Sequence, residues 1–263
     1  MKHIRAIWAY RYFIFSSIKT EFYARFVRSR LGGLWLILHP LAQVAIYALI
    51  LSQVLASKLP GIESPYAYAI YLMAGMLAWT LFAEVLSRSL NIFIDNANLI
   101  KKIAFPKIAL PFIIAGSALL NNLLLFVAIL VVFGLLGHIP SIQLLWIPFL
   151  IMLTLGLGLG FGLMLGIINV FIRDMGQIVP IILQFWFWLT PIVYVSSLIP
   201  QKYQALLLIN PMSSIAMAYQ QVLIYGKIPN LVSLIYPSIL TMGLLFLALI
   251  MYIRANEEMA DVL

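Results

Sequence analysis

Six long apolar runs constrain this chain more than any other feature. They lie near residues 34–56, 67–92, 108–136, 145–170, 177–195 and 231–253. Each run has roughly 19–29 residues, and about 20 apolar residues in a helix cross a hydrocarbon core of about 30 Å. The chain is 64% hydrophobic and 9% charged, whereas soluble domains are about half apolar and a quarter charged. The sequence therefore predicts an all-α integral membrane protein with six transmembrane helices in a single domain, residues 1–263.

The basic residues predict how these spans are oriented. Six spans place both termini on one side, and assigning that side to the cytoplasm gives it most of the Lys and Arg residues, as the positive-inside rule requires. The cytoplasmic set is Lys2, Arg5, Arg11, Lys19, Arg25, Arg28, Arg30, Lys101, Lys102, Lys107, Arg173 and Arg254, against Lys58, Lys202 and Lys227 outside. The net charge of +8 is therefore attributed to membrane topology and anionic lipid headgroups, and not to nucleic acid.

The region 1–33 is predicted to hold an amphipathic helix in the membrane interface. Helical periodicity places Phe15, Ile18, Phe22 and Phe26 on one face and Glu21, Arg25 and Arg28 on another. That pattern is typical of a helix lying in the headgroup plane. The alternative is a basic tail that only sets the topology.

A short basic segment, "DNANLIKKIAFPKIALP", separates the second and third apolar runs. In a helix Leu99, Ile100 and Ile103 would form an apolar face, with Lys101 and Lys102 pointing elsewhere. A short element of this kind, joined rigidly to two spans, suits docking into a groove of another protein. The alternative is an ordinary basic loop.

Two further segments interrupt the pattern of simple spans. The run "GLGLGFGLMLG" (156–166) lacks the strand, helix and acidic residue of a dinucleotide-binding loop, and its glycines are expected to permit close helix packing. Residues 196–230 contain two apolar pieces, 202–209 and 213–225, that are too short to span. They predict two short external re-entrant helices, whose ends must be covered by protein or a wet cavity.

Residues that carry catalytic chemistry are scarce. The sequence has no cysteine, no GxxxxGK[ST] loop for ATP and no HExxH motif, so no catalytic or metal site is predicted. Glu84 and Arg88 stand at i and i+4 in the second run, so they share a helix face and can pair. An ionisable pair inside a membrane is a functional candidate, although it could also be a self-satisfied structural pair.

The fifth run ends in "FWFWLTPIVY", with Phe185, Trp186, Phe187, Trp188 and Tyr194. Aromatic residues at a membrane boundary are often interfacial anchors. Four consecutive aromatic residues point all round a helix, however, so some must face protein or a pore. Their rings suit the apolar faces of sugars, and Trp35 and Tyr47 of the first run could contribute.

The whole chain resembles the membrane subunit of ATP-binding-cassette exporters of bacterial surface polysaccharide, the O-antigen, capsule and teichoic acid permeases. The resemblance rests on "RSRLGGLWLILHPLAQ" (28–43), the basic segment at 95–111, "RDMGQI" (173–178), the aromatic motif and "INPMSSI" (209–215). It implies a homodimer joined to two copies of a separate ATPase, which binds ATP and Mg, with no cofactor in this chain. It also implies a coupling helix at 95–107 (Asn98, Leu99, Ile100, Lys101, Lys102 and Ile103), an external gate at 196–230 and a polymer channel at the aromatic residues.

The function implied by the resemblance is ATP-driven export of polysaccharide, principally O-antigen, on undecaprenyl diphosphate across the bacterial inner membrane. Arg25 and Arg28 could bind the diphosphate, because guanidinium groups pair well with phosphate, or they could reach lipid headgroups. A teichoic acid or capsule permease is the first alternative, followed by a small-molecule or drug permease. A membrane lipid transferase is the alternative from another class.

Overall fold

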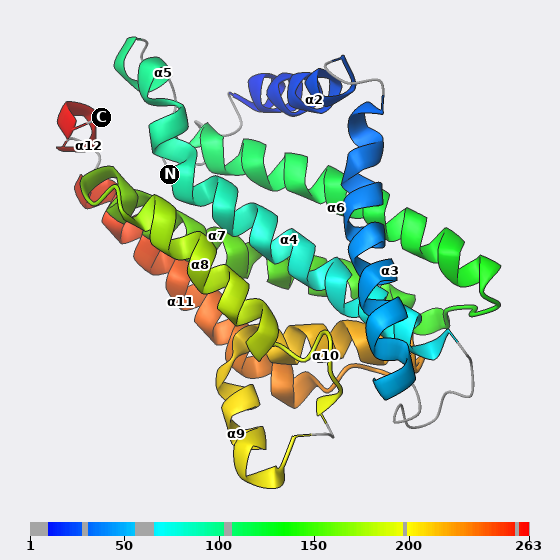
Figure 1. Cartoon of the computed structure of the whole chain (residues 1–263). Coiled ribbons are helices and arrows are strands. Elements are labelled where there is room, and N and C mark those ends of the chain that lie inside the picture. Colours follow the sequence, from blue (N-terminus) through cyan, green and yellow to red (C-terminus); the bar gives the residue numbers. More distant parts are fainter. Residues whose placement is uncertain are drawn as a thin grey trace.

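The computed structural model describes residues 10–27, 31–55, 66–102, 107–196, 199–255 and 258–262. Every regular element in these ranges is a helix (Figure 1). The helices are α2 (Arg11–Val27), α3 (Trp35–Leu55), α4 (Ala67–Asp95), α5 (Ala97–Lys102), α6 (Ala109–Leu135), α7 (Ile147–Phe171), α8 (Met175–Leu189), α9 (Gln201–Ile209), α10 (Pro211–Leu223), α11 (Leu231–Ala255) and α12 (Glu258–Val262). Short 3-10 turns precede α3 (Gly32–Leu34) and α7 (Ile142–Trp146).

Among the described residues, 4 helices are long and apolar enough to cross a membrane: α4, α6, α7 with its preceding turn, and α11. The first and fifth apolar runs correspond to α3, which is described as apolar over Trp35–Ile46, and to α8, with 15 residues. At 1.5 Å per residue α8 is about 22 Å long, shorter than the hydrocarbon core. The all-α membrane architecture is thus supported, while the count of six spans stays a prediction.

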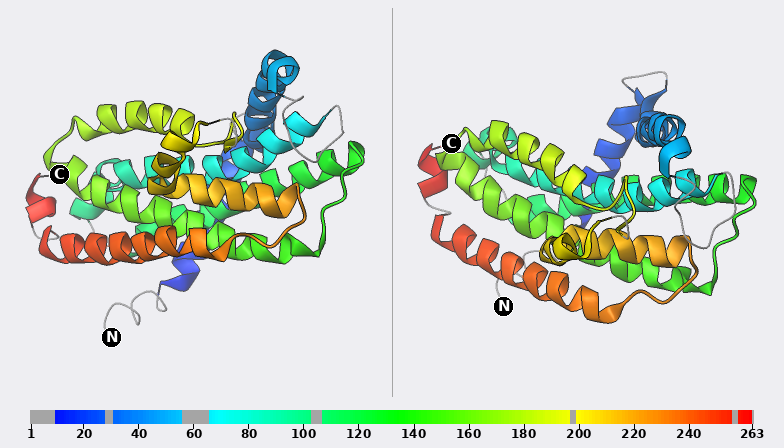
Figure 2. Two further views of the ribbon diagram at one scale, coloured as in Figure 1. Left: turned by 90° about the horizontal axis from the view of Figure 1, so that it is seen from below. Right: turned by 60° about the horizontal axis from the view of Figure 1, so that its bottom comes forward.

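The central helix of the bundle is α4. It is buried nearly all round and contacts α3, α6, α7, α8 and α10, as the views in Figure 2 also indicate. Such a helix cannot show a polar stripe along its length, because all of its faces meet other protein. The other helices around the cavity described below, α3, α6 and α8, all pack against α4.

Glycines bring α7 close to two neighbours. A Cβ added at Gly158 would lie 3.0 Å from Val85 Cβ of α4, and one at Gly162 would lie 2.9 Å from Leu86 O. On another face, a Cβ at Gly160 would lie 2.8 Å from Leu244 Cβ of α11. The expectation that these glycines permit close helix packing is confirmed.

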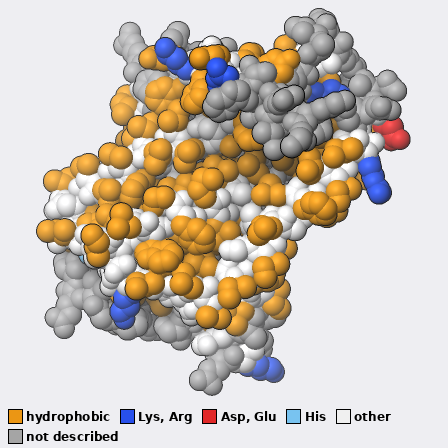
Figure 3. Space-filling view, turned by 180° about the vertical axis from the view of Figure 1, so that it is seen from behind, with side chains coloured by type: hydrophobic (Ala, Val, Ile, Leu, Met, Phe, Trp, Pro, Cys, Tyr) orange, Lys and Arg blue, Asp and Glu red, His pale blue; other side chains and the backbone are white. Residues whose placement is uncertain are grey.

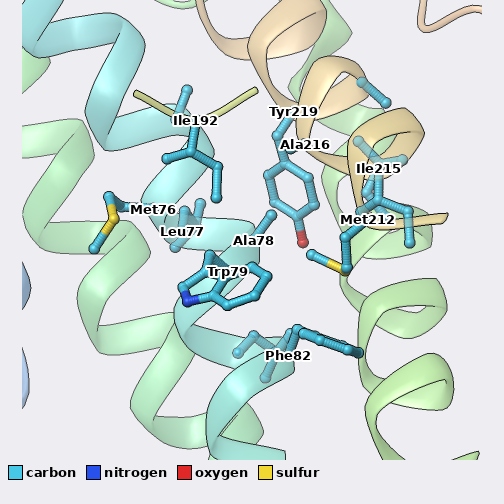
Figure 4. Packing of buried hydrophobic residues seen from close by; sticks show 14 of the residues in the cluster. Met76, Leu77, Ala78, Trp79, Phe82, Ile192, Met212, Ile215, Ala216 and Tyr219 are labelled. Carbon is cyan, nitrogen blue, oxygen red and sulfur yellow. The ribbon is translucent and has the colours of Figure 1, made fainter. Parts of the chain in front are cut away.

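The two short helices α9 and α10 lie within the segment that the sequence predicts to hold re-entrant helices. Nearly every residue of α10 is buried, and the helix packs against α4, α7 and α11. Figure 4 shows Ile215 and Tyr219 of α10 in the same cluster as Leu77 and Phe82 of α4. Protein therefore covers α10, as the prediction of a short re-entrant helix requires.

The helix α2 lies across α6 at one end of the bundle (Figure 1). Ile14 is buried, and a Cβ at Gly116 of α6 would collide with Ile18. Phe15, predicted to share a face with Ile18, is instead 71% exposed. Ile14 and Ile18 of α2 therefore pack toward the bundle, and the Phe15 ring points outward.

A second, smaller core lies at the same end of the bundle as α5 and α12. Ile100 of α5, Phe93 of α4, Ile114 of α6, Val170 of α7 and Met259 of α12 are buried together there. Seen from behind, the molecule presents a broad apolar surface with Lys and Arg near its edges (Figure 3). That distribution is the one expected of a surface that faces lipid.

Candidate functional site

A large cavity lies between α3, α4, α6 and α8, with a volume of about 1100 Å³. Four aromatic side chains line it, Trp35 of α3, Trp79 of α4, and Phe187 and Trp188 of α8. Polar groups line it as well: His39, Gln43, Thr80, Glu84, Asn121, Asn122 and Gln184. A large concave site with aromatic walls and a few polar groups is the usual form of a ligand-binding site.

The aromatic wall is a packed group of rings. Trp79 and Phe187 meet edge to face with centroids 5.5 Å apart, and Phe187 meets Trp188 in the same way at 5.6 Å. Phe187 is buried, whereas Trp188 is 51% exposed and Trp35, on the α3 side, is 54% exposed. The buried Phe187 ring thus contacts both the buried Trp79 and the half-exposed Trp188.

Glu84 lies on the wall of the cavity and belongs to a charged network that joins α2, α4 and α6. Asn121 donates its amide to Glu84 Oε1 at 2.6 Å, and Arg88 pairs with the same oxygen at 3.4 Å. Arg88 also pairs with Glu21 Oε1 of α2 at 2.6 Å, and Ser117 of α6 donates to Glu21 Oε2 at 2.8 Å. One guanidinium therefore links two carboxylates, an arrangement that its planar fork allows.

This network revises the expected role of α2. The sequence places Glu21 with Arg25 and Arg28 on a face turned to headgroups, but Glu21 points inward to Arg88 and Ser117. A partly buried carboxylate of this kind needs a partner inside the protein. The Glu84 and Arg88 pair predicted from its spacing is present, and it is the inner half of a larger network.

Trp186 does not line the cavity. Its indole Nε1 donates to Asn210 Oδ1 at 2.8 Å, and its ring meets Phe82 and Phe161 with centroids 5.1 Å and 5.4 Å apart. Asn210 also accepts from the backbone N–H of Met212 and thereby caps α10. Trp186 therefore joins the end of α8 to the start of α10, in contrast to the neighbouring Phe187 and Trp188.

The turn that follows α8 is non-helical and buried, so its carbonyl groups need partners. Side chains of the neighbouring helices supply them. The Tyr68 hydroxyl of α4 donates to Val193 O at 2.7 Å, and the Tyr71 hydroxyl lies 3.1 Å from Pro191 O. Gln220 of α10 donates to the same Pro191 O at 2.9 Å. The turn is thus attached to both α4 and α10.

Phe185 and Tyr194 lie apart from the cavity. Phe185 is 69% exposed on the outer side of α8. Tyr194 is partly buried in the turn after α8, and its carbonyl accepts from Tyr71 at 3.0 Å. The side chain of Tyr47 lies outside the described residues.

The predicted coupling residues divide between two environments. Ile100 is buried against Phe93, Leu110 and Ile114, whereas Leu99 is 43% exposed, and Asn98 is exposed as well. Successive residues of a helix point about 100° apart, so these two neighbours cannot serve one narrow face. The side chains of Lys101 and Lys102, and Ile103 as a whole, lie outside the described residues, as do the side chain of Arg25 and the whole of Arg28.

Several residues of the site escaped the sequence analysis. Trp79 lines the cavity, and Tyr68, Tyr71 and Gln220 hold the turn after α8. Trp79 lies inside an apolar run, where a tryptophan is equally suited to packing or to a hydrogen bond between helices. No spacing rule links Tyr68 or Gln220 to a turn so distant in the chain.

Comparison with known proteins gives one consistent result. The sequence matches the ABC-2 type transporter family over residues 12–224. It is 27% identical over 260 residues to the O-antigen export system permease protein RfbA of Myxococcus xanthus, an alignment that covers 98% of each chain. It is 30% identical over 210 residues to the protein of the same name from Klebsiella pneumoniae, covering 77% of this chain and 76% of that one.

A relative with a different printed name is the polysialic acid transport protein KpsM of Escherichia coli. It is 28% identical to this chain over 247 residues, covering 90% of this chain and 91% of the relative. The family match spans more than half of the chain and includes α2, the cavity, the charged network and α10. The chain therefore belongs to the ABC-2 type transporter family and is a multi-pass membrane permease, the transport subunit that works with an ABC ATPase.

Proposed function

We propose that this chain is the permease half of an ATP-driven exporter that moves O-antigen, linked to undecaprenyl diphosphate, across the bacterial inner membrane. In this proposal two copies form a homodimer on two copies of a separate ATPase. Each copy has six spans, with α3 and α8 as the first and fifth, and both termini in the cytoplasm. Arg25 and Arg28 meet the diphosphate or the lipid headgroups at the cytoplasmic interface.

The observation that carries the proposal is the cavity walled by Trp35, Trp79, Phe187 and Trp188. Aromatic rings provide wide, rigid apolar faces with few rotatable bonds, and sugar rings have C–H faces that can stack on them. The amides of the cavity lining can exchange hydrogen bonds with hydroxyl groups. Because no single bond fixes the register, a polymer can be held and still slide.

The charged network supports a path that begins at the cytoplasmic end of the bundle. Glu84 lines the large cavity, whereas Arg88 and Glu21 line a second cavity of about 520 Å³. That second cavity lies between α2, α4, α5 and α6, and Leu99 of the proposed coupling helix is part of its wall. Movement of α5 could thus reach the network, and through Glu84 the wall of the proposed channel.

The external gate of the proposal consists of α9, α10 and the turn after α8. Its support is the set of bonds by which Tyr68, Tyr71, Trp186 and Gln220 join that turn and the end of α8 to α4 and α10. Segments attached in this way are expected to move together. Capsular polysaccharide is the second candidate cargo, because KpsM, a polysialic acid transport protein, aligns over 90% of this chain.

The test of the channel uses the two exposed rings of the cavity. Trp35→Ala and Trp188→Ala should each weaken polymer export per molecule of permease by roughly fivefold, from a contribution of about 1 kcal/mol for each ring. The matched control is Trp146→Ala, because Trp146 is a partly buried tryptophan outside the cavity. The measurement is surface polymer divided by the amount of permease in the membrane.

The result that would refute the channel is unchanged export in the double variant, with normal amounts of permease. Trp188→Phe should be milder than Trp188→Ala if stacking matters. If both exposed tryptophans were only interfacial anchors, the amount of permease would fall and export per molecule would not.

The test of the coupling helix uses the unequal burial of Leu99 and Ile100. Leu99→Ser should weaken association with the ATPase without changing the stability of the permease, because the side chain is 43% exposed. Ile100→Ser should lower the stability itself, because Ile100 is 7% exposed in the second core. Co-purification of the ATPase and thermal unfolding separate these effects, and full ATPase recovery with Leu99→Ser would contradict docking at α5.

A further inference from the structure

A groove on the membrane-facing side of the molecule lies apart from the proposed channel. It runs between α6 and α11, with α7 as its floor, and has a volume of about 460 Å³. Leu159, Leu163 and Ile167 line the floor at intervals of four residues, so a single stripe of α7 faces the groove. The walls are Ile108, Pro111 and Phe112 on one side and Leu245, Ala248, Leu249 and Tyr252 on the other.

The groove has one polar end. Lys107, which precedes α6, and Tyr252, in the last two turns of α11, lie at that end. The Tyr252 ring is stacked on Phe93 of α4, with centroids 6.2 Å apart and an interplanar angle of 16°. All other lining residues are apolar. The site therefore has the polarity of a membrane lipid, with one cationic end and a long hydrocarbon surface.

The surroundings identify hydrocarbon as the occupant of the apolar part. The walls belong to α6 and α11, two helices long and apolar enough to cross a membrane. Phe112 and Leu249 on the rim are 43% and 45% exposed, so the groove opens to the side. Water finds no hydrogen-bond partners along such walls, and an empty groove would forfeit dispersion contacts. An acyl chain supplies those contacts.

The polar end identifies the headgroup class. A lysine ammonium is a compact cation with three donors and binds phosphate oxygens as a point charge. A basic residue near a membrane surface favours anionic lipid by about 1 kcal/mol, which corresponds to roughly a fivefold preference. The Tyr252 hydroxyl is a further donor at the same end of the groove.

We propose that this groove binds one acyl chain of an anionic glycerophospholipid such as phosphatidylglycerol, with Lys107 against its phosphate. The site differs from the proposed polymer channel in its walls, its opening and its ligand. It lies beside the second core, which contains Phe93 and Ile100. A lipid bound there contacts α6 directly after the coupling segment.

The experiment uses the full chain in nanodiscs that contain a phosphatidylglycerol probe with a photoactivatable diazirine on its acyl chain. Adducts are mapped by peptide mass spectrometry. They should concentrate on the groove, at Phe112 and Leu249, over apolar residues elsewhere that are more exposed, such as Val127 and Met242. Lys107→Gln should lower the phosphatidylglycerol adducts in the groove roughly fivefold. It should lower adducts of a matched phosphatidylethanolamine probe less, because that headgroup has its own ammonium beside the phosphate.

Two further variants complete the test. Leu163→Trp fills the floor of the groove and should abolish adducts there with both probes, while Lys227→Gln, a lysine in an external segment, should change neither. Unfolding temperatures exclude variants that fail to fold.

Three results would overturn the proposal. Adducts spread evenly over the groove and the other exposed residues would indicate ordinary boundary lipid. Equal labelling by the two probes in the wild-type protein would show that the groove does not select an anionic headgroup. Cross-linking of Leu249→Cys chains to one another, without lipid adducts, would show that a second copy of the chain covers the groove.

Discussion

The packing of α7 against α4 can be tested by adding one methyl group at Gly162. The new carbon would lie 2.5 Å from Ser89 Cβ and 2.9 Å from Leu86 O, whereas carbon atoms pack best at about 3.5–4.0 Å. Neither obstacle can rotate away, because one is a Cβ and the other belongs to the backbone. Gly162→Ala therefore requires the two helices to separate by roughly 1 Å, the shortfall from that optimal distance.

The size of the effect follows from two opposing contributions. Overpacking costs about 1–3 kcal/mol, and a fixed obstacle places this site near the upper value. Replacing glycine by alanine inside a helix returns about 1 kcal/mol. Gly162→Ala should therefore lower the free energy of unfolding by about 2 kcal/mol. Gly243→Ala on α11, where no described atom lies within 4 Å of the added carbon, should raise it by about 1 kcal/mol.

The assay is reversible unfolding of the purified chain in mixed micelles with increasing fractions of SDS, followed by circular dichroism. Adding Ser89→Gly to Gly162→Ala removes the nearer obstacle and should recover part of the loss. If Gly162→Ala proves as stable as Gly243→Ala, the close approach of α4 and α7 does not depend on glycine and the reasoning fails.

Two other predictions concern hydrogen-bonded groups. Arg88→Gln should lower the stability of the chain more than Glu21→Gln does, because it leaves Glu21 and Glu84 without their shared cation. A double-mutant cycle between Arg88 and Glu21 should show a coupling energy of about 1 kcal/mol, which is typical of a partly exposed pair. Strict additivity of the two substitutions would contradict the network. Tyr71→Phe should cost about 1–3 kcal/mol in the same unfolding assay, because Tyr194 O loses the Tyr71 donor and Pro191 O is left with Gln220, whereas Tyr12→Phe, at a side chain 74% exposed, should cost nothing measurable.

Much of the architecture could be predicted because hydrophobic length and helical spacing are local properties. The apolar runs at 67–92, 108–136 and 231–253 correspond to α4, α6 and α11 within a few residues. The spacing of Glu84 and Arg88 sufficed to predict their pairing. In each case one helix contains all the residues on which the inference depends.

The candidate site was less predictable because its residues come from helices far apart in the chain. The aromatic motif indicated which residues could stack on a sugar, but every ring of four consecutive aromatic residues has a different direction around the helix. The neighbours of α8 decide which rings line the cavity: Asn210 holds Trp186 toward α10, while Phe187 turns to Trp79. Nothing in the sequence around Trp186 indicates that its indole bonds to Asn210.

By itself the sequence determined the class of the protein, the main membrane-crossing helices and the short helices between them, since burying apolar side chains and pairing backbone groups within a helix are decided residue by residue. Only the tertiary structure decided the inward direction of Glu21, the burial of Ile100 beside the exposed Leu99, and the donors Tyr68, Tyr71 and Gln220 for the turn after α8. Each of these depends on which polar or apolar group a distant helix presents. The physical reason is that a side chain inside a membrane protein takes the partner that packing brings to it, and a linear pattern does not contain that partner.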